Sequence, residues 1–148
     1  MVGPSLENIF PGLRGQHYEV QSPPDADYNC IAWAAGAKRS WWWPDLDHED
    51  VWPAGVARVE TLDAFRDAFA TLGYATCDNE HSQAGYEKIA VFALAGVPKH
   101  ATRQQSSGRW TSKIGRQQDI EHGLHDLEGE EYGSVVLVMR RPMPAAGD

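Results

Sequence analysis

Hydrophobic residues recur at helical spacing in one segment near the middle of the chain. Leu62, Phe65, Phe69 and Leu72 repeat every three or four positions, which places all four on one face of an α-helix. A threonine that can cap the first turn precedes this run, and Gly73, a residue that favours helix ends, follows it. The pattern therefore predicts a helix whose apolar face packs against a core.

A shorter apolar run begins at Cys30 and predicts a second helix over residues 30–37. The side-chain oxygen of Asn29 or Asp27 can accept a hydrogen bond from the N–H groups of its first turn, and Gly36 lies near its end. Residues 40–55, which follow, are rich in proline and aspartate, and this composition indicates a loop.

The second half of the chain has the composition of strands. Residues 86–94, 98–104 and 109–114 follow one another with short turns, so they predict an antiparallel meander. The last apolar run, residues 133–141, is hydrophobic enough for a central strand of a sheet.

A third helix is predicted to begin at Asp119, because Ile120, Leu124 and Leu127 repeat on one helical face. Helices thus come mostly before strands along the chain. This order indicates an α+β fold in which the helix that starts at Cys30 packs against an antiparallel sheet.

The length of 148 residues fits one domain. We expect residues 1–26, which are rich in proline and glycine, to form an irregular arm, and residues 27–148 to form the core. The net charge of −8, without a basic stripe, argues against nucleic acid as a partner. Neither a secretory signal nor an apolar run of about 18 residues is recognisable, so we expect a cytoplasmic protein that does not contact membranes.

Cys30 lies where a helix is expected to start. The unpaired N–H groups and the helix dipole at such a position favour the thiolate and lower the thiol pKa from about 8.5. Cys30 is therefore a candidate nucleophile, and the alternative is a buried packing residue. No disulfide with Cys77 is expected in a reducing compartment.

His100 is the candidate base for this thiol. It lies in a predicted strand between Lys99 and Ala101, where an imidazole is not an ordinary filler. The other histidines are expected in the arm, in polar loops or on a helix face: His17, His48, His81, His122 and His125.

The hairpin that follows His100 predicts which residues face each other. Residues 106–108 end in glycine and fit a three-residue loop whose last residue is left-handed. In that register Gln105 pairs with Arg109, so Thr102 faces Ser112.

Ser112 then shares the face of His100, one diagonal step away on the neighbouring strand. Its hydroxyl could accept the imidazole N–H and orient the ring. A register shifted by one residue would place Lys113 or Thr111 there instead, and Asp119 is the rival orienting residue.

Trp41, Trp42 and Trp43 form a run that could stack on a ring or a base. The alternative is that they cover the edge of the sheet and the end of the first helix, with one ring at a substrate cleft. Together with Trp33 and Trp110 they are the candidate substrate-binding residues.

Two segments offer metal-binding side chains without the spacing of a known site. Residues 45–50 (DLDHED) match no calcium loop, and His122 and His125 lack the order H-E-x-x-H. Both are interpreted as solvated, and neither a metal nor another cofactor is expected.

Three motifs carry a resemblance to a known superfamily. NCIAWA (29–34), HATRQ (100–104) and GRWTSKIG (108–115) follow in the order helix cysteine, strand histidine and polar residue on the next strand. The chain thereby resembles the papain-like cysteine hydrolases, which include NlpC/P60-type domains, and a group of small bacterial domains with N-C-x-A-W-A, H-A-x-R-Q and W-T-S-K-x-G. The glutamine that precedes the cysteine in papain-like peptidases has no match, and neither has a clear Asn or Asp at the third catalytic position.

The resemblance implies a papain-like fold and a cysteine hydrolase that acts on a peptide or amide through an acyl-enzyme. Cys30 would attack, His100 would take the proton, Ser112 or Asp119 would orient the ring, and Asn29 or the backbone N–H of Cys30 would bind the oxyanion. A transglutaminase-like acyltransferase is the alternative within this chemistry. The competing class is an immunity- or adaptor-type module that binds a protein partner through an acidic, tryptophan-bearing surface. The oligomeric state is left open.

Overall fold

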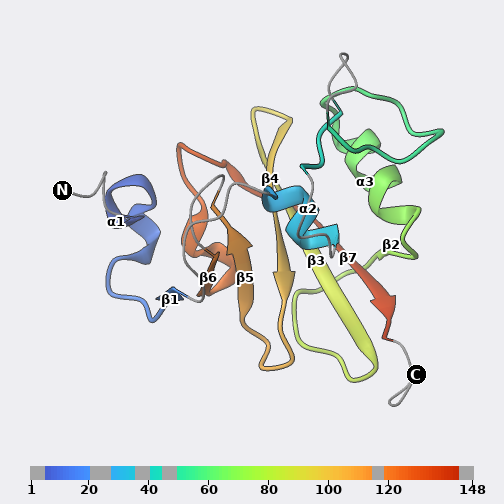
Figure 1. The fold of residues 1–148 in the computed structure, drawn as a ribbon. Coiled ribbons are helices and arrows are strands. Elements are labelled where there is room, and N and C mark those ends of the chain that lie inside the picture. Colours follow the sequence, from blue (N-terminus) through green and yellow to red (C-terminus); the bar gives the residue numbers. More distant parts are fainter. Residues whose placement is uncertain (1–5, 21–27, 36–40, 45–49, 115–118, 144–148) are drawn as a thin grey trace.

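The computed structural model describes residues 6–20, 28–35, 41–44, 50–114 and 119–143, and it is built around one seven-stranded sheet (Figure 1). The strand order is β1-β6-β5-β4-β3-β7-β2, and every neighbouring pair is antiparallel. The strands are β1 (Glu19–Val20), β2 (Ala75–Thr76), β3 (Tyr86–Leu94), β4 (Val97–Gln104), β5 (Trp110–Lys113), β6 (Asp119–His122) and β7 (Ser134–Pro142). The helices are α1 (Leu6–Ile9), α2 (Cys30–Ala35) and α3 (Leu62–Ala70), with 3₁₀ turns η1 (Pro11–Leu13) and η2 (Leu124–Leu127). The α+β class is confirmed.

The predicted meander is present as β3, β4 and β5, and its hairpin has the predicted register. Gln104 pairs with Trp110, and the Gln105 N–H donates to the Arg109 carbonyl at 2.8 Å. Gly108 has a φ of 90°, a left-handed conformation that glycine adopts without a steric penalty. The turn chemistry of the loop thus sets which side chains of β4 and β5 share a face.

The two faces of the sheet are covered by different parts of the chain. Along β3, Ile89 and Val91 belong to one core cluster, whereas Ala90 and Phe92 belong to another. Because side chains alternate along a strand, the two clusters lie on opposite faces. We call them the α2 face, which α2 and α3 cover, and the arm face, which α1, η1 and η2 cover.

The helix α2 begins at the predicted residue and is capped by Asn29. The Asn29 Oδ1 accepts a hydrogen bond from the N–H of Ala32 at 3.0 Å and a second from the N–H of Trp42 at 3.0 Å. Its Nδ2 donates to the Trp42 carbonyl at 2.8 Å. One side chain therefore caps α2 and fixes the tryptophan segment against it. The predicted end of this helix, at residues 36 and 37, lies outside the described residues.

The helix α3 confirms the strongest pattern in the sequence. Thr61 Oγ1 accepts the N–H of Ala64 at 3.2 Å as the N-cap, and Gly73 follows with a φ of 95°. Phe65 and Phe69 are buried in the α2-face cluster.

The N-terminal arm contains more regular secondary structure than expected. Within residues 6–20 it forms α1, η1 and β1, and it buries Phe10 and Leu13 in the arm-face cluster. In Figure 1 it runs beside the β1–β6 edge, far from α3. The arm thus contributes to the hydrophobic cover of the arm face.

The predicted helix at Asp119 is wrong. Residues 119–122 form β6, which pairs with β5 on one side and β1 on the other, and η2 follows it. Ile120, Leu124 and Leu127 are buried together as the pattern required. A strand followed by a 3₁₀ turn buries the same three side chains, and pairing on both edges decided against a helix.

The strand β7 pairs with β3 from Tyr86–Pro142 to Ala93–Ser134 and with β2 at only two positions. It is therefore flanked on both sides, as predicted, but it is mostly half-exposed.

Candidate functional site

Cys30 is the first residue of α2 and lies on the α2 face, at the wall of a pocket. Its side chain is 8% exposed, and it packs with Ala101 of β4. The pocket has a volume of about 470 Å³. We call it the Cys30 pocket; its lining residues are Asn29, Cys30, Trp41, Trp43, Asp50, Lys99, Glu131 and Tyr132.

The predicted lowering of the thiol pKa is wrong. Burial raises the pKa of Cys30 to about 11, against the hydrogen bonds of the Ala101, Ile31 and Cys30 backbone N–H groups and the charge of Lys113, which lower it. The helix start is present, but α2 has only six residues, and removal of the sulfur from water outweighs it. The resting sulfur is a neutral thiol surrounded by N–H groups.

His100 is the neighbour of Ala101 in β4, but its side chain lies on the other face of the sheet from Cys30. Successive residues of β4 alternate, so Ala101 points to the α2 face and His100 to the arm face. The imidazole contacts Phe92 edge-on at 5.3 Å and stacks on Tyr132, with ring centroids 4.0 Å apart and planes within 4°. The expected facing pair of thiol and imidazole is corrected accordingly: neither ring nitrogen of His100 is hydrogen-bonded to the Cys30 sulfur.

Tyr132 connects the two groups. Its ring stacks on His100, and it also lines the Cys30 pocket. Burial, the charge of Cys30 and the charge of Glu131 raise the pKa of its hydroxyl well above 10. Tyr132 is not among the predicted site residues, because a lone tyrosine in a polar segment carries no periodic signal.

The predicted contact between His100 and Ser112 is confirmed. The His100 Nε2 lies 2.9 Å from the Ser112 Oγ, and the imidazole is fully buried. The other ring nitrogen, Nδ1, is buried without a hydrogen-bond partner. Burial, and then the neighbouring His122, hold the pKa of His100 well below 6.5, so the ring is neutral at pH 7. A neutral imidazole has the protonation state that a general base requires.

His122 completes a polar network on the arm face, contrary to its predicted place on a solvated helix face. Its Nε2 lies 2.7 Å from the Ser112 Oγ, and its Nδ1 lies 2.7 Å from the Gly123 carbonyl. The Thr102 Oγ1 accepts a hydrogen bond from the Ser112 Oγ at 2.9 Å and donates to the Thr111 carbonyl at 2.7 Å. Burial lowers the pKa of His122 to about 4, against the Gly123 hydrogen bond and Asp126, which raise it. In a strand, Ile120 and His122 lie on the same face. A strand prediction for this segment would therefore have placed His122 beside the buried Ile120.

Asp119 is buried at the start of β6, where its carboxylate accepts a hydrogen bond from the Tyr28 hydroxyl at 2.9 Å. Among the described residues, Asp119 is not a hydrogen-bond partner of His100. Of the two predicted orienting residues, Ser112 is the one that contacts the imidazole. Asn29 lines the Cys30 pocket, but its amide group is engaged by Trp42 and by the cap of α2.

The five candidate tryptophans are separated by the fold. Trp41 and Trp43 line the Cys30 pocket, and Trp42 packs against the core. Trp33 is buried, donates its Nε1–H to the Thr111 Oγ1 at 3.2 Å, and lines a second groove of about 960 Å³ together with Arg103. Trp110 is buried in the arm-face cluster, away from the pocket.

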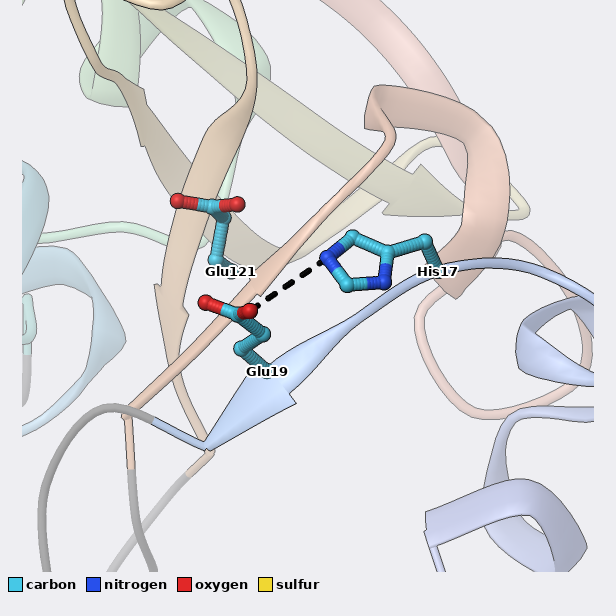
Figure 2. Close-up of side chains that lie close together, drawn as sticks. All are labelled: His17, Glu19 and Glu121. Carbon is cyan, nitrogen blue, oxygen red and sulfur yellow. Dashed lines mark ion pairs between the residues drawn. The ribbon is translucent and has the colours of Figure 1, made fainter.

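One group of possible metal ligands occurs among the described residues. The ligand atoms of His17, Glu19 and Glu121 lie within 4.8 Å of one another, and Figure 2 shows the ion pair of His17 with Glu19 at 3.4 Å. Glu121 also pairs with the Arg109 guanidinium at 3.1 Å. This cation already supplies the positive charge that a metal would bring. The acidic residues 45–49 lie outside the described residues. His125 is exposed as predicted and forms ion pairs with Glu80 at 2.8 Å and Glu128 at 3.1 Å.

Fold and site together define a class: an α+β protein with a free cysteine at a helix start and a buried histidine–serine–histidine network on the adjoining strands. The model of a family described as a domain of unknown function, DUF7689, matches residues 19–140, and the chain belongs to this family. Curated proteins and solved structures gave no match. Among the described residues, no helix has the length and apolar character needed to cross a membrane.

Proposed function

We propose that this protein is a cysteine hydrolase that acts on an amide or related acyl bond, with Cys30 as the nucleophile and His100 as the base. One observation carries the proposal. The Cys30 sulfur lies in a pocket wall beside the backbone N–H groups of Cys30, Ile31 and Ala101, and the residue next to Ala101 is a histidine whose buried Nδ1 has no hydrogen-bond partner.

The N–H groups around the sulfur supply the second element that acyl transfer needs. An oxyanion that forms on a carbonyl bound at Cys30 requires preorganised donors, and backbone N–H groups at a helix start serve this role in acyl-transfer sites. The Asn29 amide is engaged elsewhere, so the proposed oxyanion donors are backbone groups, with that of Cys30 first.

The proposed reaction proceeds through an acyl-enzyme. The Cys30 Sγ attacks the carbonyl carbon while the thiol proton passes to His100 Nδ1, and the oxyanion collapses as the leaving amine takes that proton. Water then attacks the thioester, gives its proton to His100, and releases the carboxylic acid as the thiol is reprotonated. Transfer to an amine in place of water gives the acyltransferase variant of the same site.

The resting structure is a closed form of this site. The shifts that keep the thiol and the imidazole neutral both come mainly from burial, so admission of substrate and water lowers the pKa of Cys30 and raises that of His100. Tyr132 is in contact with both parts of the proposed site, since it stacks on the imidazole and lines the pocket. The proposed proton transfer requires a rearrangement that brings Sγ and Nδ1 together, and movement of the Tyr132 ring is its proposed first step.

The test is acylation by an activated ester. Full-length protein is incubated with p-nitrophenyl acetate, and the acetyl adduct is located by intact-mass and peptide mass spectrometry. We expect one acetyl group on Cys30, its loss in Cys30→Ser, and its retention in Cys77→Ser, the matched control with a half-buried free thiol. Absence of the Cys30 adduct, or equal modification of Cys77, would overturn the proposal.

A non-enzymatic binding module is the second candidate, and the raised pKa of Cys30 is the observation that favours it. In that case the Cys30 pocket, with the Trp41 and Trp43 rings and both Asp50 and Glu131, is a surface for a protein partner. The same ester experiment separates the two, because a packing cysteine forms no acyl-enzyme.

A further inference from the structure

The groove of about 960 Å³ beside Trp33 lies on the α2 face, because its residue Arg103 pairs with Ile89 of the α2-face cluster. Its volume is near the upper end of the range of about 300–1,000 Å³ for ligand sites in proteins. We call it the Trp33 groove, and none of its lining residues lines the Cys30 pocket. Its lining includes parts of α2, β4, β5 and two turns: Trp33, Arg103, Thr111, residues 82–84 and residues 105–107.

Four charged side chains line the Trp33 groove, and three of them are paired. Glu87 forms an ion pair with Arg141. Arg109 forms an ion pair with Glu121 at 3.1 Å. The fourth is Arg103, and no carboxylate of the described residues lies within ion-pair distance of it. The groove thus holds one cation that its neighbours do not neutralise, in a chain of net charge −8.

The Arg103 guanidinium is held in place on a tryptophan ring. Its Cζ lies 4.3 Å from the centroid of the Trp33 ring, and its Nη1 donates to the Trp33 carbonyl at 3.4 Å. Thr111 completes the arrangement, since its Oγ1 accepts the Trp33 Nε1–H at 3.2 Å and donates to the Arg103 carbonyl at 3.1 Å. A guanidinium has five N–H donors, and within the described ranges Arg103 uses one of them. The cation is therefore preorganised, and its other donors are available to a ligand.

The charge and the lining of the groove select the kind of ligand. One unpaired cation matches one negative charge, and a planar guanidinium can present two parallel N–H donors to a carboxylate. Glu87 and Glu121, although paired, repel a doubly charged phosphate more strongly than a carboxylate. Much of the remaining lining consists of neutral side chains that donate and accept hydrogen bonds, as peptide amides require: Ser82, Gln83, Gln104, Gln105, Ser106 and Ser107.

We propose that the Trp33 groove binds a short peptide that bears a free carboxylate, and that Arg103 is the residue that recognises this carboxylate. The group is the C-terminus of the peptide or an Asp or Glu side chain, and the probes below distinguish these sources. Trp33, Arg103 and Thr111 each come from a different one of the motifs NCIAWA, HATRQ and GRWTSKIG. The inference goes beyond the proposed hydrolase, because the two sites share no lining residue.

The test is an NMR titration of the full-length protein labelled with ¹⁵N, followed through the Trp33 indole N–H and the Arg103 Nε–H signals. The probes are acetyl-Gly-Gly-Gly with a free C-terminus, the same peptide as its C-terminal amide, acetyl-Gly-Asp-Gly amide, and inorganic phosphate. We expect one or both carboxylate peptides to bind at least about tenfold more tightly than the Gly-Gly-Gly amide, the usual effect of a hydrogen bond to a charged group. Whichever of the two binds more tightly identifies a terminal or a side-chain carboxylate as the source.

Two variants remove the same charge from the same face of β4. Arg103→Gln should reduce the affinity for the carboxylate peptides to that for the amide. Lys99→Gln, the matched control, removes the lysine of the Cys30 pocket four residues away and should leave the affinities unchanged. Arg103→Lys keeps the charge without the planar fork, so it should lose part of the preference, and it replaces Arg103→Gln should the latter fail to fold.

Urea unfolding of each variant shows whether it is folded. In wild type, the absence of binding, equal affinity for acid and amide, or tighter binding of phosphate than of both carboxylate peptides overturns the proposal. A preference that is unchanged in folded Arg103→Gln or Arg103→Lys, or that disappears in Lys99→Gln, also overturns it. If Arg103 only fastens α2 to the sheet, Arg103→Gln lowers the free energy of unfolding while the acid and amide peptides bind wild type alike.

Discussion

Acidification tests the buried histidine network without any knowledge of the substrate. The unfolded chain binds a proton on each imidazole near pH 6.5, whereas the folded protein resists protonation of His122 down to about 4. Between these values the unfolded state holds more protons than the native state, so the free energy of unfolding falls as the pH falls. Protonation of His122 therefore leaves the free energy of unfolding unchanged above the unfolded pKa and lowers it increasingly below that pKa.

The magnitude follows from the two pKa values of His122. The difference between 6.5 and about 4 corresponds to about 3 kcal/mol, since each pH unit is worth about 1.4 kcal/mol. His100, whose pKa is also lowered, adds a loss of the same sign. Against a typical total stability of about 5–15 kcal/mol, the pair makes the fold distinctly acid-sensitive.

Urea unfolding followed by tryptophan fluorescence at several pH values between 7.5 and 4.5 measures this loss. His122→Gln is less stable than wild type at neutral pH but should lose about 1.4 kcal/mol less per pH unit below about pH 6, where only the unfolded state is protonated at this position. His125→Gln should change the slope in the opposite direction and only above about pH 6.5, because, against burial, Glu128 and Glu80 raise the pKa of His125, and the stability this gives is lost as the pH rises through that pKa. Equal slopes in wild type and His122→Gln would refute the reasoning.

Three further substitutions test separate parts of the structure. Gly133→Ala should destabilise the fold by about 3 kcal/mol in urea unfolding, because φ is +76° and the new Cβ would lie 1.9 Å from a carbonyl oxygen of β3; Gly129→Ala, with open space around it, should cost less. Asn29→Ala should lower the unfolding free energy by about 1–2 kcal/mol through loss of the α2 cap, and a change within error would contradict the capping role. Tyr132→Ala should raise the rate of Cys30 alkylation by iodoacetamide at least about tenfold by admitting water to a thiol with a raised pKa, whereas an unchanged rate would show that this ring does not close the pocket.

Local patterns in the sequence were sufficient for several elements and for one contact of the site. The helix α3 follows from apolar spacing and Thr61, and the β4–β5 register follows from the loop that ends in Gly108. Because side chains alternate along strands, that register alone predicted the Ser112–His100 hydrogen bond. Each of these predictions depends on interactions within a short stretch of chain.

The errors come from interactions between distant segments. Residues 119–122 form a strand because β5 and β1 pair with both of its edges, and no local pattern contains that information. The thiol pKa of Cys30 is raised because packing removes water from a short helix start, which the sequence position alone does not reveal. His122 was misplaced for the first of these reasons, so the second imidazole of the network was missed.

The proposed function requires that the Cys30 thiol of α2 and the His100 imidazole of β4, which lie on opposite faces of the sheet, act as one catalytic pair. The most direct measurement is the rate of Cys30 acylation by p-nitrophenyl acetate in wild type and in His100→Gln, with unfolding curves to confirm that both proteins are folded. General-base assistance predicts a rate lower by about 10²–10⁴-fold in His100→Gln. Equal rates in the two folded proteins would contradict the account.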